Sequence, residues 1–379
     1  MLFTDLKIRD ITLPNRVCVS PMSQYAAEDG YANDWHFAHL SRFALGGCGL
    51  IFTEATAVSR AARRTHGDLG LWEDGQVEEL ARIALFIKAQ GSVAGVQLAH
   101  AGRKASERRP WHGETPVDEE DVSLRNEAPW QAVGPTTERY GEQWPEPHVL
   151  SGDEIEQIID DFGQAAARVD RAGFDVIEVY AAHGFLLHQF YSPLSNTRED
   201  DWGGDFEGRI RLSVEVARSI RRHWPDSKPL FFRLSATDWL EGGWTVEDSV
   251  ALARRLKAEG VDLIDCSSGG LGGPHPPIKF PLGPAFQAEL AADVRSGADI
   301  STMAVGFIWQ PEVAERVLSS GQADLVALAR ELLNDPNWTL HAAQTLGLDD
   351  KFERWKPAFG WWLNKRERVM RKLGLRNED

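Results

Sequence analysis

Short apolar runs rich in β-branched residues alternate with amphipathic stretches along nearly the whole chain. The runs predict eight strands, at residues 16–20, 50–54, 94–98, 176–180, 230–234, 263–266, 302–305 and 325–328. Between them, apolar residues recur at a spacing near 3.6 and predict helices that include residues 75–90, 152–172, 206–224, 245–259 and 310–319. Several helices are followed by the glycine that commonly ends a helix, at Gly91, Gly173, Gly260 and Gly321.

Eight strand-helix units of this kind predict an α/β protein built as a (β/α)8 TIM barrel of roughly 250 residues. Residues 105–149 lack periodicity and interrupt the units after the third strand, so we interpret them as a capping insertion over the site. We expect the barrel to span residues 1–345 and residues 346–379 to form an aromatic C-terminal tail. An open doubly wound sheet fits less well, because no glycine fingerprint follows the first strand.

Composition narrows the function classes. The chain has 379 residues with 41 Lys+Arg and 57 Asp+Glu, a net charge of −16 that disfavours nucleic acid and anionic membranes. Its cysteines, Cys18, Cys48 and Cys266, stand far apart, so neither a disulfide framework nor a metal site is expected. We find no secretory signal and no apolar run long enough to span a membrane, and we expect a cytoplasmic protein.

Polar residues gather where the predicted strands end, which is where a barrel of this kind carries its chemistry. Gly306 and Arg330 follow the seventh and eighth strands, a position at which amides and a forked cation often hold phosphate. Tyr180 and His183 end the fourth strand, where both can donate to one electronegative atom. Taken alone, Gly306, Arg330 and His183 each also fit a purely structural role. Together with them, four side chains at neighbouring strand ends suit an electron-rich heterocycle: Gln97, His100, Lys104 and Arg233.

Several longer runs carry a resemblance to a known family. They are SPMSQY, LIFTEATAV, GVQLAHAGRKAS, GFDVIEVYAAHGFLLHQFYSPLSNTREDDWGGDFEGRIRL, FFRLSATDW, DCSSGGL and ADLVALARELLNDP. Over residues 1–345 the chain resembles the FMN-dependent old yellow enzyme family, and within it the bacterial branch that includes xenobiotic reductases. The resemblance implies a barrel that holds FMN at its mouth and reduces activated C=C bonds with NADH or NADPH.

The resemblance also implies roles for individual residues. Tyr25 and Trp362 would shape the substrate side, which also takes in Lys104. The residues implied to contact the flavin ring are Pro21, Met22, Ser23, Ala55, Gln97 and Arg233, and those implied to hold the phosphate are Gly306, Ala329 and Arg330.

Three positions depart from the family pattern. Ser23 stands where this branch usually has a cysteine that tunes the flavin. Tyr180 replaces the first member of the pair that binds the substrate carbonyl, which leaves His183 as the second. Phe185 stands where a tyrosine usually protonates the substrate carbon, and a phenyl ring has no proton to give. The proton is then expected from water, Tyr180 or Tyr191, or is not needed for quinones.

We expect hydride transfer from NAD(P)H through flavin N5 to enones, quinones or related electrophiles. Because the Tyr-x-x-His motif also resembles the trimethylamine dehydrogenase relatives, oxidation of an amine with Tyr180 and His183 as the orienting pair remains an alternative. A flavin-binding protein with little turnover is a third. The Trp-rich tail indicates subunit contact in a homodimer or higher homo-oligomer.

Overall fold

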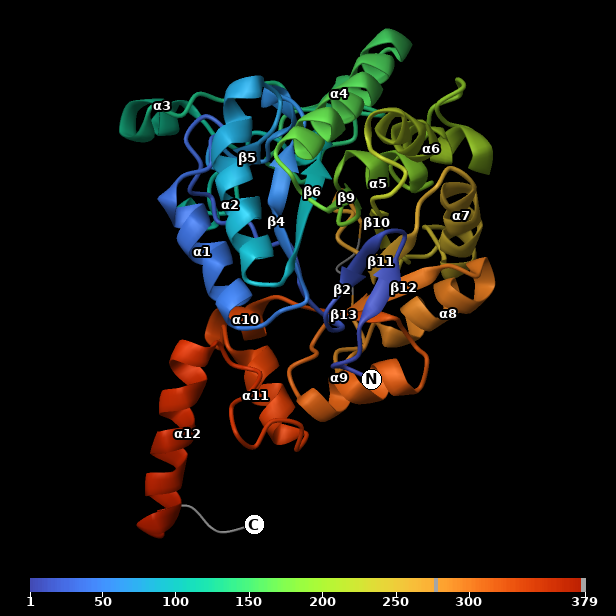
Figure 1. Ribbon diagram of the computed structural model, residues 1–379. Helices are drawn as coiled ribbons and strands as arrows, with labels where there is room; N and C mark the ends of the chain where they lie inside the picture. The colour runs from blue at the N-terminus through green and yellow to red at the C-terminus, as the bar shows by residue number, and fades with distance from the viewer. Residues whose placement is uncertain (276–278, 376–379) are drawn as a thin grey trace.

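The computed structural model describes residues 1–275 and 279–375, so the last four residues of the predicted tail lie outside it. A closed barrel of parallel strands forms its centre, in which each strand pairs with the next and the last pairs with the first (Figure 1). The predicted TIM barrel is thereby confirmed. The strands are β3 (Val17–Val19), β4 (Leu50–Ala57), β6 (Val93–Ala99), β9 (Val176–Ala181), β10 (Leu230–Ser235), β11 (Leu263–Ser267), β12 (Ser301–Val305) and β13 (Leu325–Leu328).

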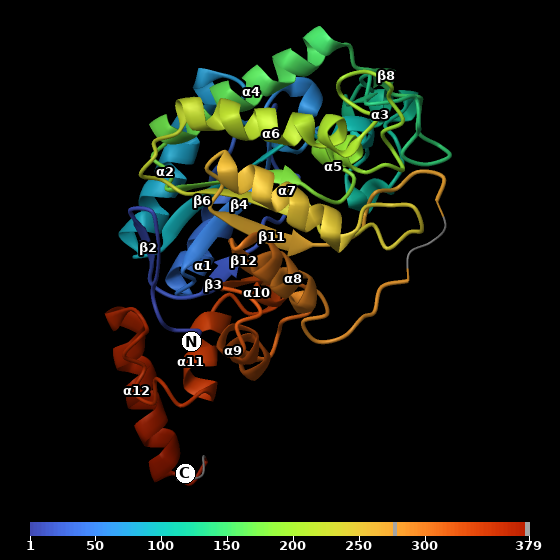
Figure 2. The same ribbon diagram turned by 90° about the vertical axis from the view of Figure 1, so that its right-hand side faces the viewer.

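Helices surround the barrel on its outer face, as Figures 1 and 2 show. The five helices named from periodicity appear within two residues of their predicted ends. They are α2 (Val77–Ala89), α4 (Gly152–Arg171), α6 (Phe206–His223), α7 (Val246–Ala258) and α9 (Pro311–Ser319). The remaining helices are α1 (Asp34–Leu45), α3 (Glu119–Arg125), α5 (Leu186–Tyr191), α8 (Ala288–Ala298), α10 (Arg330–Asn334), α11 (Trp338–Thr345) and α12 (Pro357–Lys372).

The amino-terminal end of the barrel is closed by the antiparallel hairpin of β1 (Leu6–Ile8) and β2 (Ile11–Leu13). Ile8 and Leu13 from this hairpin pack onto an apolar layer inside the barrel that includes Phe52, Phe231 and Met303. Among the described residues, the barrel interior is therefore apolar at this end, and the polar interior side chains of the strands lie nearer the opposite end.

The predicted insertion has more structure than its sequence indicates. It contains α3 and a short parallel pair, β7 (Val133–Gly134) with β8 (His148–Val149). The helix forms because Asp118 caps it, accepting hydrogen bonds from the Glu120 and Asp121 main-chain N–H groups. After the barrel, α12 projects away from the body in both views (Figures 1 and 2).

Candidate active site at the carboxyl ends of the strands

Along the strands that form the site, the side chains inside the barrel change from apolar near the amino-terminal end to polar near the carboxyl end. In β10, Phe231 belongs to the apolar interior layer, while Phe232 and Leu234 pack outward against the helices. Because side chains alternate along a strand, Arg233 lies inside the barrel one step above Phe231, and Ser235 lies above Arg233. The same alternation sets three layers of side chains in β9 and β11: Val176, Glu178 and Tyr180 in β9, and Leu263, Asp265 and Ser267 in β11.

A charged cluster occupies the middle layer, and we call Gln97, Glu178, Arg233 and Asp265 the cofactor-side cluster. Strand register places Gln97 beside Glu178 and Arg233 beside Asp265. The Gln97 side-chain amide donates to Glu178 Oε1 at 2.8 Å, and Arg233 Nε lies 3.3 Å from Asp265 Oδ2. The Arg233 guanidinium also donates to the Ser20 hydroxyl at 2.9 Å. All four side chains are buried.

Burial governs the ionisation of this cluster. Removal from water raises the pKa of Glu178, and the nearby Asp265 carboxylate raises it further, while Arg233 opposes the change. Desolvation likewise raises the pKa of Asp265. Two carboxyl groups thus face one guanidinium, and Arg233 is the cation that compensates them.

The loops after β12 and β13 enclose a second feature of the site. Gly306, at φ +111°, opens a cavity of about 340 Å³ that is also lined by Phe307, Ala329 and Arg330. A Cβ at Gly306 would come within 2.6 Å of the Gln287 side-chain amide, so glycine is required here. The Arg330 guanidinium lies over the Phe307 ring, 5.4 Å from its centroid.

These two features fit the FMN that the resemblance implies. Gln97 uses its N–H on Glu178 and keeps its carbonyl oxygen to accept a hydrogen bond, while Arg233 is a donor, which matches the alternating edge of a flavin pyrimidine ring. The cavity beside Gly306 offers main-chain amides and the Arg330 fork, which suit a phosphate. Pro21, Met22 and Ser23 follow β3, and Ala55 lies in β4 with 8% of its surface exposed.

A second cluster lies on the layer above, and we call Lys104, Tyr180, His183 and Phe185 the substrate-side cluster. The Tyr180 hydroxyl and His183 Nδ1 are 2.8 Å apart, and His183 Nε2 lies 2.6 Å from the Ser267 hydroxyl. Phe185 packs on Tyr180 with ring centroids 4.1 Å apart. The tyrosine, histidine and serine therefore form one continuous hydrogen-bonded chain.

The backbone of His183 is held in a conformation that few residues adopt, with φ +53°. Its N–H donates to the Ser235 hydroxyl at 2.9 Å, and its carbonyl accepts from Lys104 Nζ at 2.9 Å. A side chain at Gly270 would come within 2.8 Å of the His183 Cα atom. Three neighbours thus fix a strained histidine, which is typical of functional sites.

Tyr25 also has a positive φ, +55°, and lies at the edge of the insertion. Its carbonyl accepts from Arg109, and its ring packs edge-on against Trp111 at 5.6 Å. Burial raises the pKa of Tyr25 to about 12, so its hydroxyl stays protonated at neutral pH. It is placed to donate a hydrogen bond rather than to act as a base.

Of the expected site residues, Lys104 lies with the substrate-side cluster, whereas Tyr191 and His100 are enclosed by the protein. Tyr191, an expected proton source, is fully buried, and its hydroxyl donates to the Ala181 carbonyl at 2.8 Å, so it does not reach a substrate. His100 is buried too, and burial lowers its pKa to about 3.

Trp362 is 62% exposed on α12, where the ring contacts found for it involve Trp361 and Lys365 within the described residues. The structure therefore does not bring it together with the clusters of its own chain.

Sequence reasoning did not single out Glu178, Asp265 or Ser267. A signal was present for the carboxylates, because each is a charge inside an otherwise apolar strand, VIEVY or LIDCS. Such a charge must be paired or functional.

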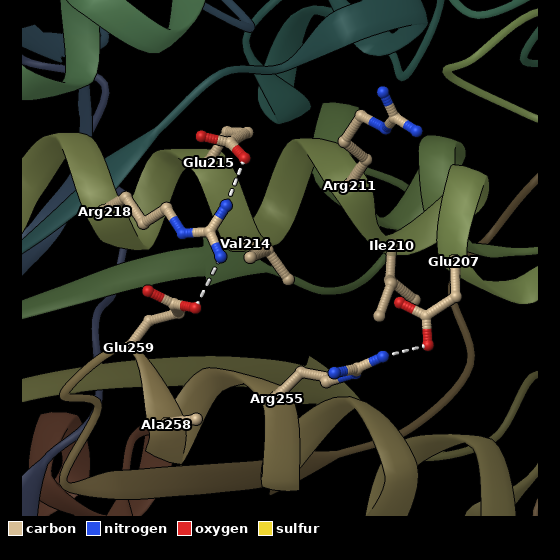
Figure 3. Close-up of a pocket in the computed structure, with 9 residues that line it drawn as sticks. All are labelled: Glu207, Ile210, Arg211, Val214, Glu215, Arg218, Arg255, Ala258 and Glu259. Carbon is tan, nitrogen blue, oxygen red and sulfur yellow. Dashed lines mark hydrogen bonds and ion pairs between the residues drawn. The ribbon is translucent and has the colours of Figure 1, made fainter.

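A separate cavity of about 270 Å³ lies on the outer face between α6 and α7 (Figure 3). Most of its charges pair with one another: Arg218 bonds Glu215 and Glu259, and Arg255 bonds Glu207. It is a helix-helix seam bridged by ion pairs, away from the strand ends.

The part of the chain covered by the structure contains no helix that combines the length and apolarity needed to cross a membrane. The same residues include no group of three or more His, Cys, Asp or Glu side chains that could hold a metal ion.

Comparisons with known proteins place the chain among flavin enzymes. Residues 1–349 match the family described as NADH:flavin oxidoreductase / NADH oxidase. An NADPH dehydrogenase of Listeria innocua is 41% identical over 348 residues, 91% of this chain and 95% of the relative. An NADH:flavin oxidoreductase of Gibberella zeae is 43% identical over 364 residues, 92% of this chain and 87% of the relative.

Solved structures agree with these matches. A morphinone reductase variant in complex with tetrahydroNAD is similar with a TM-score of 0.71 and 26% identity, covering 92% of this chain and 91% of that chain. A 2-naphthoyl-CoA reductase complexed with 2-naphthoyl-CoA gives a TM-score of 0.81 and 25% identity over 91% of this chain. This chain spans about half of that larger protein, 52% of its length.

Proposed function

This chain belongs to the NADH:flavin oxidoreductase / NADH oxidase family, the old yellow enzyme family, and we propose that Tyr180 and His183 hold the oxygen of the enone or quinone it reduces. It is an FMN-dependent oxidoreductase that uses NAD(P)H and acts on small molecules. Bound FMN would supply the hydride-transfer chemistry, with NAD(P)H as the source of the hydride. The chain's own residues must bind the acceptor, polarise it and supply the proton.

The observation that carries the proposal is the hydrogen-bonded chain from Tyr180 through His183 to Ser267. Burial lowers the pKa of His183 well below its usual range, with Arg233 and Lys104 adding to the effect, so the imidazole is neutral. Burial also raises the pKa of Tyr180, which keeps its proton. With its proton on Nδ1, His183 donates to the Tyr180 oxygen, which leaves the Tyr180 O–H free to donate to the acceptor oxygen.

We assign the cofactor contacts on the same basis. Gln97 and Arg233 would bind the pyrimidine edge of FMN, and Gly306, Ala329 and Arg330 would hold its phosphate. Pro21, Met22, Ser23 and Ala55 would lie against the ring, with the Ser23 hydroxyl in reach of its edge. Tyr25 and Phe185 would wall the substrate pocket.

The test is anaerobic reduction by NADPH followed by reoxidation with 2-cyclohexenone or a quinone. Tyr180→Phe should slow reoxidation by the enone roughly tenfold or more, because a donor to the developing oxyanion is lost. Tyr31→Phe removes an exposed hydroxyl bonded to Glu73 and serves as the matched control. Flavin bleaching by an N-methylated amine without nicotinamide would instead favour the oxidative alternative.

We propose that residues 105–149 cap the site of the barrel. Two contacts support this assignment. Arg103 pairs with Glu138 of the insertion, and the Tyr140 carbonyl accepts from the Gly273 N–H at 2.7 Å. The insertion is thereby fastened to the loop that follows β11.

We also propose that α12 contacts a second copy in a homodimer or larger homo-oligomer. Phe359, Trp361 and Trp362 are exposed along this projecting helix, and aromatic side chains commonly anchor interfaces. If Trp362 lines a substrate pocket, that pocket belongs to the second copy. Light scattering on Trp361→Ser/Trp362→Ser should report a smaller particle than the parent protein.

The cytoplasm is our proposed location, and nucleic acid is not an expected partner. Cys18, Cys48 and Cys266 are buried free thiols, which suit a reducing compartment. The net charge of −16 opposes polyanion binding.

A further inference from the structure

Lys104 ends η3 (Gly102–Lys104), directly after β6, and its side chain is 6% exposed. Its ammonium donates one hydrogen bond within the described residues, to the His183 carbonyl at 2.9 Å. It lies over two aromatic rings, 4.7 Å from the centroid of Tyr140 and 5.6 Å from that of Phe185. An ammonium has three N–H donors, so this one keeps donors beyond the hydrogen bond to His183.

This cation also lacks the partner that buried cations usually have. Among the described residues, no carboxylate lies within 4.0 Å of Lys104 Nζ, whereas the equally buried Arg103 pairs with Glu138 on the same turn. An unpaired buried charge is costly, and structures that keep one commonly use it. The ring beside it, Phe185, occupies the position where the chain lacks an acid.

We propose that Lys104 is the catalytic acid that protonates the substrate carbon during enone reduction. The proposal rests on the proposed function and names the proton source that it leaves open. Among the side chains considered as proton sources, Tyr191 donates to the Ala181 carbonyl. The proposed function assigns the Tyr180 O–H to the acceptor oxygen, with His183 bonded to the Tyr180 oxygen. Lys104 approaches from β6, a different strand, beside the ring that replaces the usual phenol.

The step balances as the addition of one hydride and one proton across C=C. The hydride supplied through FMN by NAD(P)H forms the C–H bond at the β-carbon, and the π electrons move toward the α-carbon and the carbonyl. One Lys104 N–H bond breaks as its proton forms the new C–H bond at the α-carbon. The neutral amine then regains a proton from solvent. A quinone needs no such transfer, since its oxygens take protons directly.

The residues around Lys104 set the pKa of its ammonium group. Burial lowers the pKa of Lys104 to about 7, which is near the value at which a general acid works best. Arg64 and Arg103 lower it further, and Glu107 and Glu114 oppose them. The other titratable groups that face the amine from packed elements are His183, which is kept neutral, and the Tyr140 phenol, whose pKa burial raises.

The test compares reoxidation of the reduced holoenzyme by 2-cyclohexenone and by a quinone. Lys104→Met should slow the enone reaction roughly 100-fold and the quinone reaction far less, because general acid catalysis contributes on that scale. The parent enone rate should fall as pH rises above about 7, and this dependence should vanish in the variant. Lys351→Met, which changes an exposed lysine, is the matched control.

Two further variants keep the test decisive if the methionine disturbs packing. Lys104→Arg retains a cation but holds its proton too tightly to serve as an acid, so the enone rate should fall in a protein that still binds FMN. Phe185→Tyr in the Lys104→Met background should restore much of the enone rate by supplying a phenol. Equal losses for enone and quinone, or no rescue, would overturn the proposal.

A measurement independent of turnover follows Lys104 itself. In ε-13C-lysine-labelled holoenzyme, one NMR signal that disappears in Lys104→Met should titrate near pH 7. A titration near the ordinary value of 10.5 would contradict the assignment. If the parent enzyme reoxidises with neither enone nor quinone, the proposed function fails, whatever this titration gives.

Discussion

The cofactor-side and substrate-side clusters are both buried, yet they treat charge in opposite ways. In the cofactor-side cluster, Arg233 faces two carboxyl groups, Glu178 and Asp265. Three ionisable groups are therefore held in one fixed arrangement. Above, Lys104 has no carboxylate partner among the described residues and lies on aromatic rings. The difference indicates that the lower layer is built to hold and orient, while the upper layer is built to change protonation state.

The largest effect is expected from breaking the lower layer. Arg233→Met leaves Glu178 and Asp265 buried without their cation, and loss of one partner of such a group costs about 3–5 kcal/mol. Urea unfolding with FMN removed from both proteins measures the loss directly. Arg222→Met, an exposed arginine on α6, should stay within about 0.5 kcal/mol of the parent protein. A similar loss of unfolding free energy in both variants would mean that the two clusters do not differ in how they hold charge.

The phosphate cavity should give the next effect. Arg330→Ala removes the forked cation beside Gly306, and we expect FMN affinity to fall about 100-fold or more, so the protein should purify largely colourless. FMN titration followed by fluorescence measures the change. Arg316→Ala, on the exposed face of α9, should stay yellow. A fully yellow Arg330→Ala protein would refute the assignment.

The substrate-side cluster can be sharpened by adding an acid. Phe185→Tyr places a phenol beside Tyr180 and Lys104, and reoxidation by an enone should accelerate roughly tenfold at most, because Lys104 already supplies a proton. Reoxidation by a quinone should change much less. Stopped-flow rates with both acceptors test this, and equal acceleration would show that the substitution acts through packing.

The fold was predictable because each unit obeys simple periodicity. The apolar runs locate all eight barrel strands within three residues, and α4 matches its predicted start because Ser151 caps it. The helices that were not named from periodicity include α1 and α8. In α1 the sequence WHFAHLSRFAL mixes aromatic and polar residues on both faces, and in α8 Asp293 and Gly297 weaken the apolar stripe. Tertiary packing stabilises them where local pattern does not.

Which residues belong to the site was easier to predict from the sequence than which of them contact one another. Strand ends and motif resemblance single out Tyr180, His183 and Arg233, because each lies near a predicted strand end. Contacts between distant segments, such as Lys104 with the His183 carbonyl, depend on how the loops close above the barrel. Exposure of Trp362 on a projecting helix likewise could not be read from its sequence position.

Per pH unit, the smallest effect we expect is a change in stability, and it contrasts the clusters most directly. Glu178 has a raised pKa when folded, so the folded state binds more protons than the unfolded chain, and the stability it contributes is lost as pH rises above 4.5. Lys104 has a pKa lowered from 10.5 to about 7, so the unfolded chain binds more protons between these values. Its contribution to the free energy of unfolding therefore grows as pH rises from 7 to 10.5.

Differences in urea unfolding between parent and variant proteins isolate each contribution. The free energy of unfolding of the parent minus that of Glu178→Gln should decrease as pH rises above 4.5. The same difference taken with Lys104→Met should increase between pH 7 and 10.5. Neither slope should exceed about 1.4 kcal/mol per pH unit, since each involves one proton. Slopes of the same sign would mean that the two clusters do not store charge differently, whereas opposite signs follow only if the carboxyl is buried protonated and the amine is buried neutral.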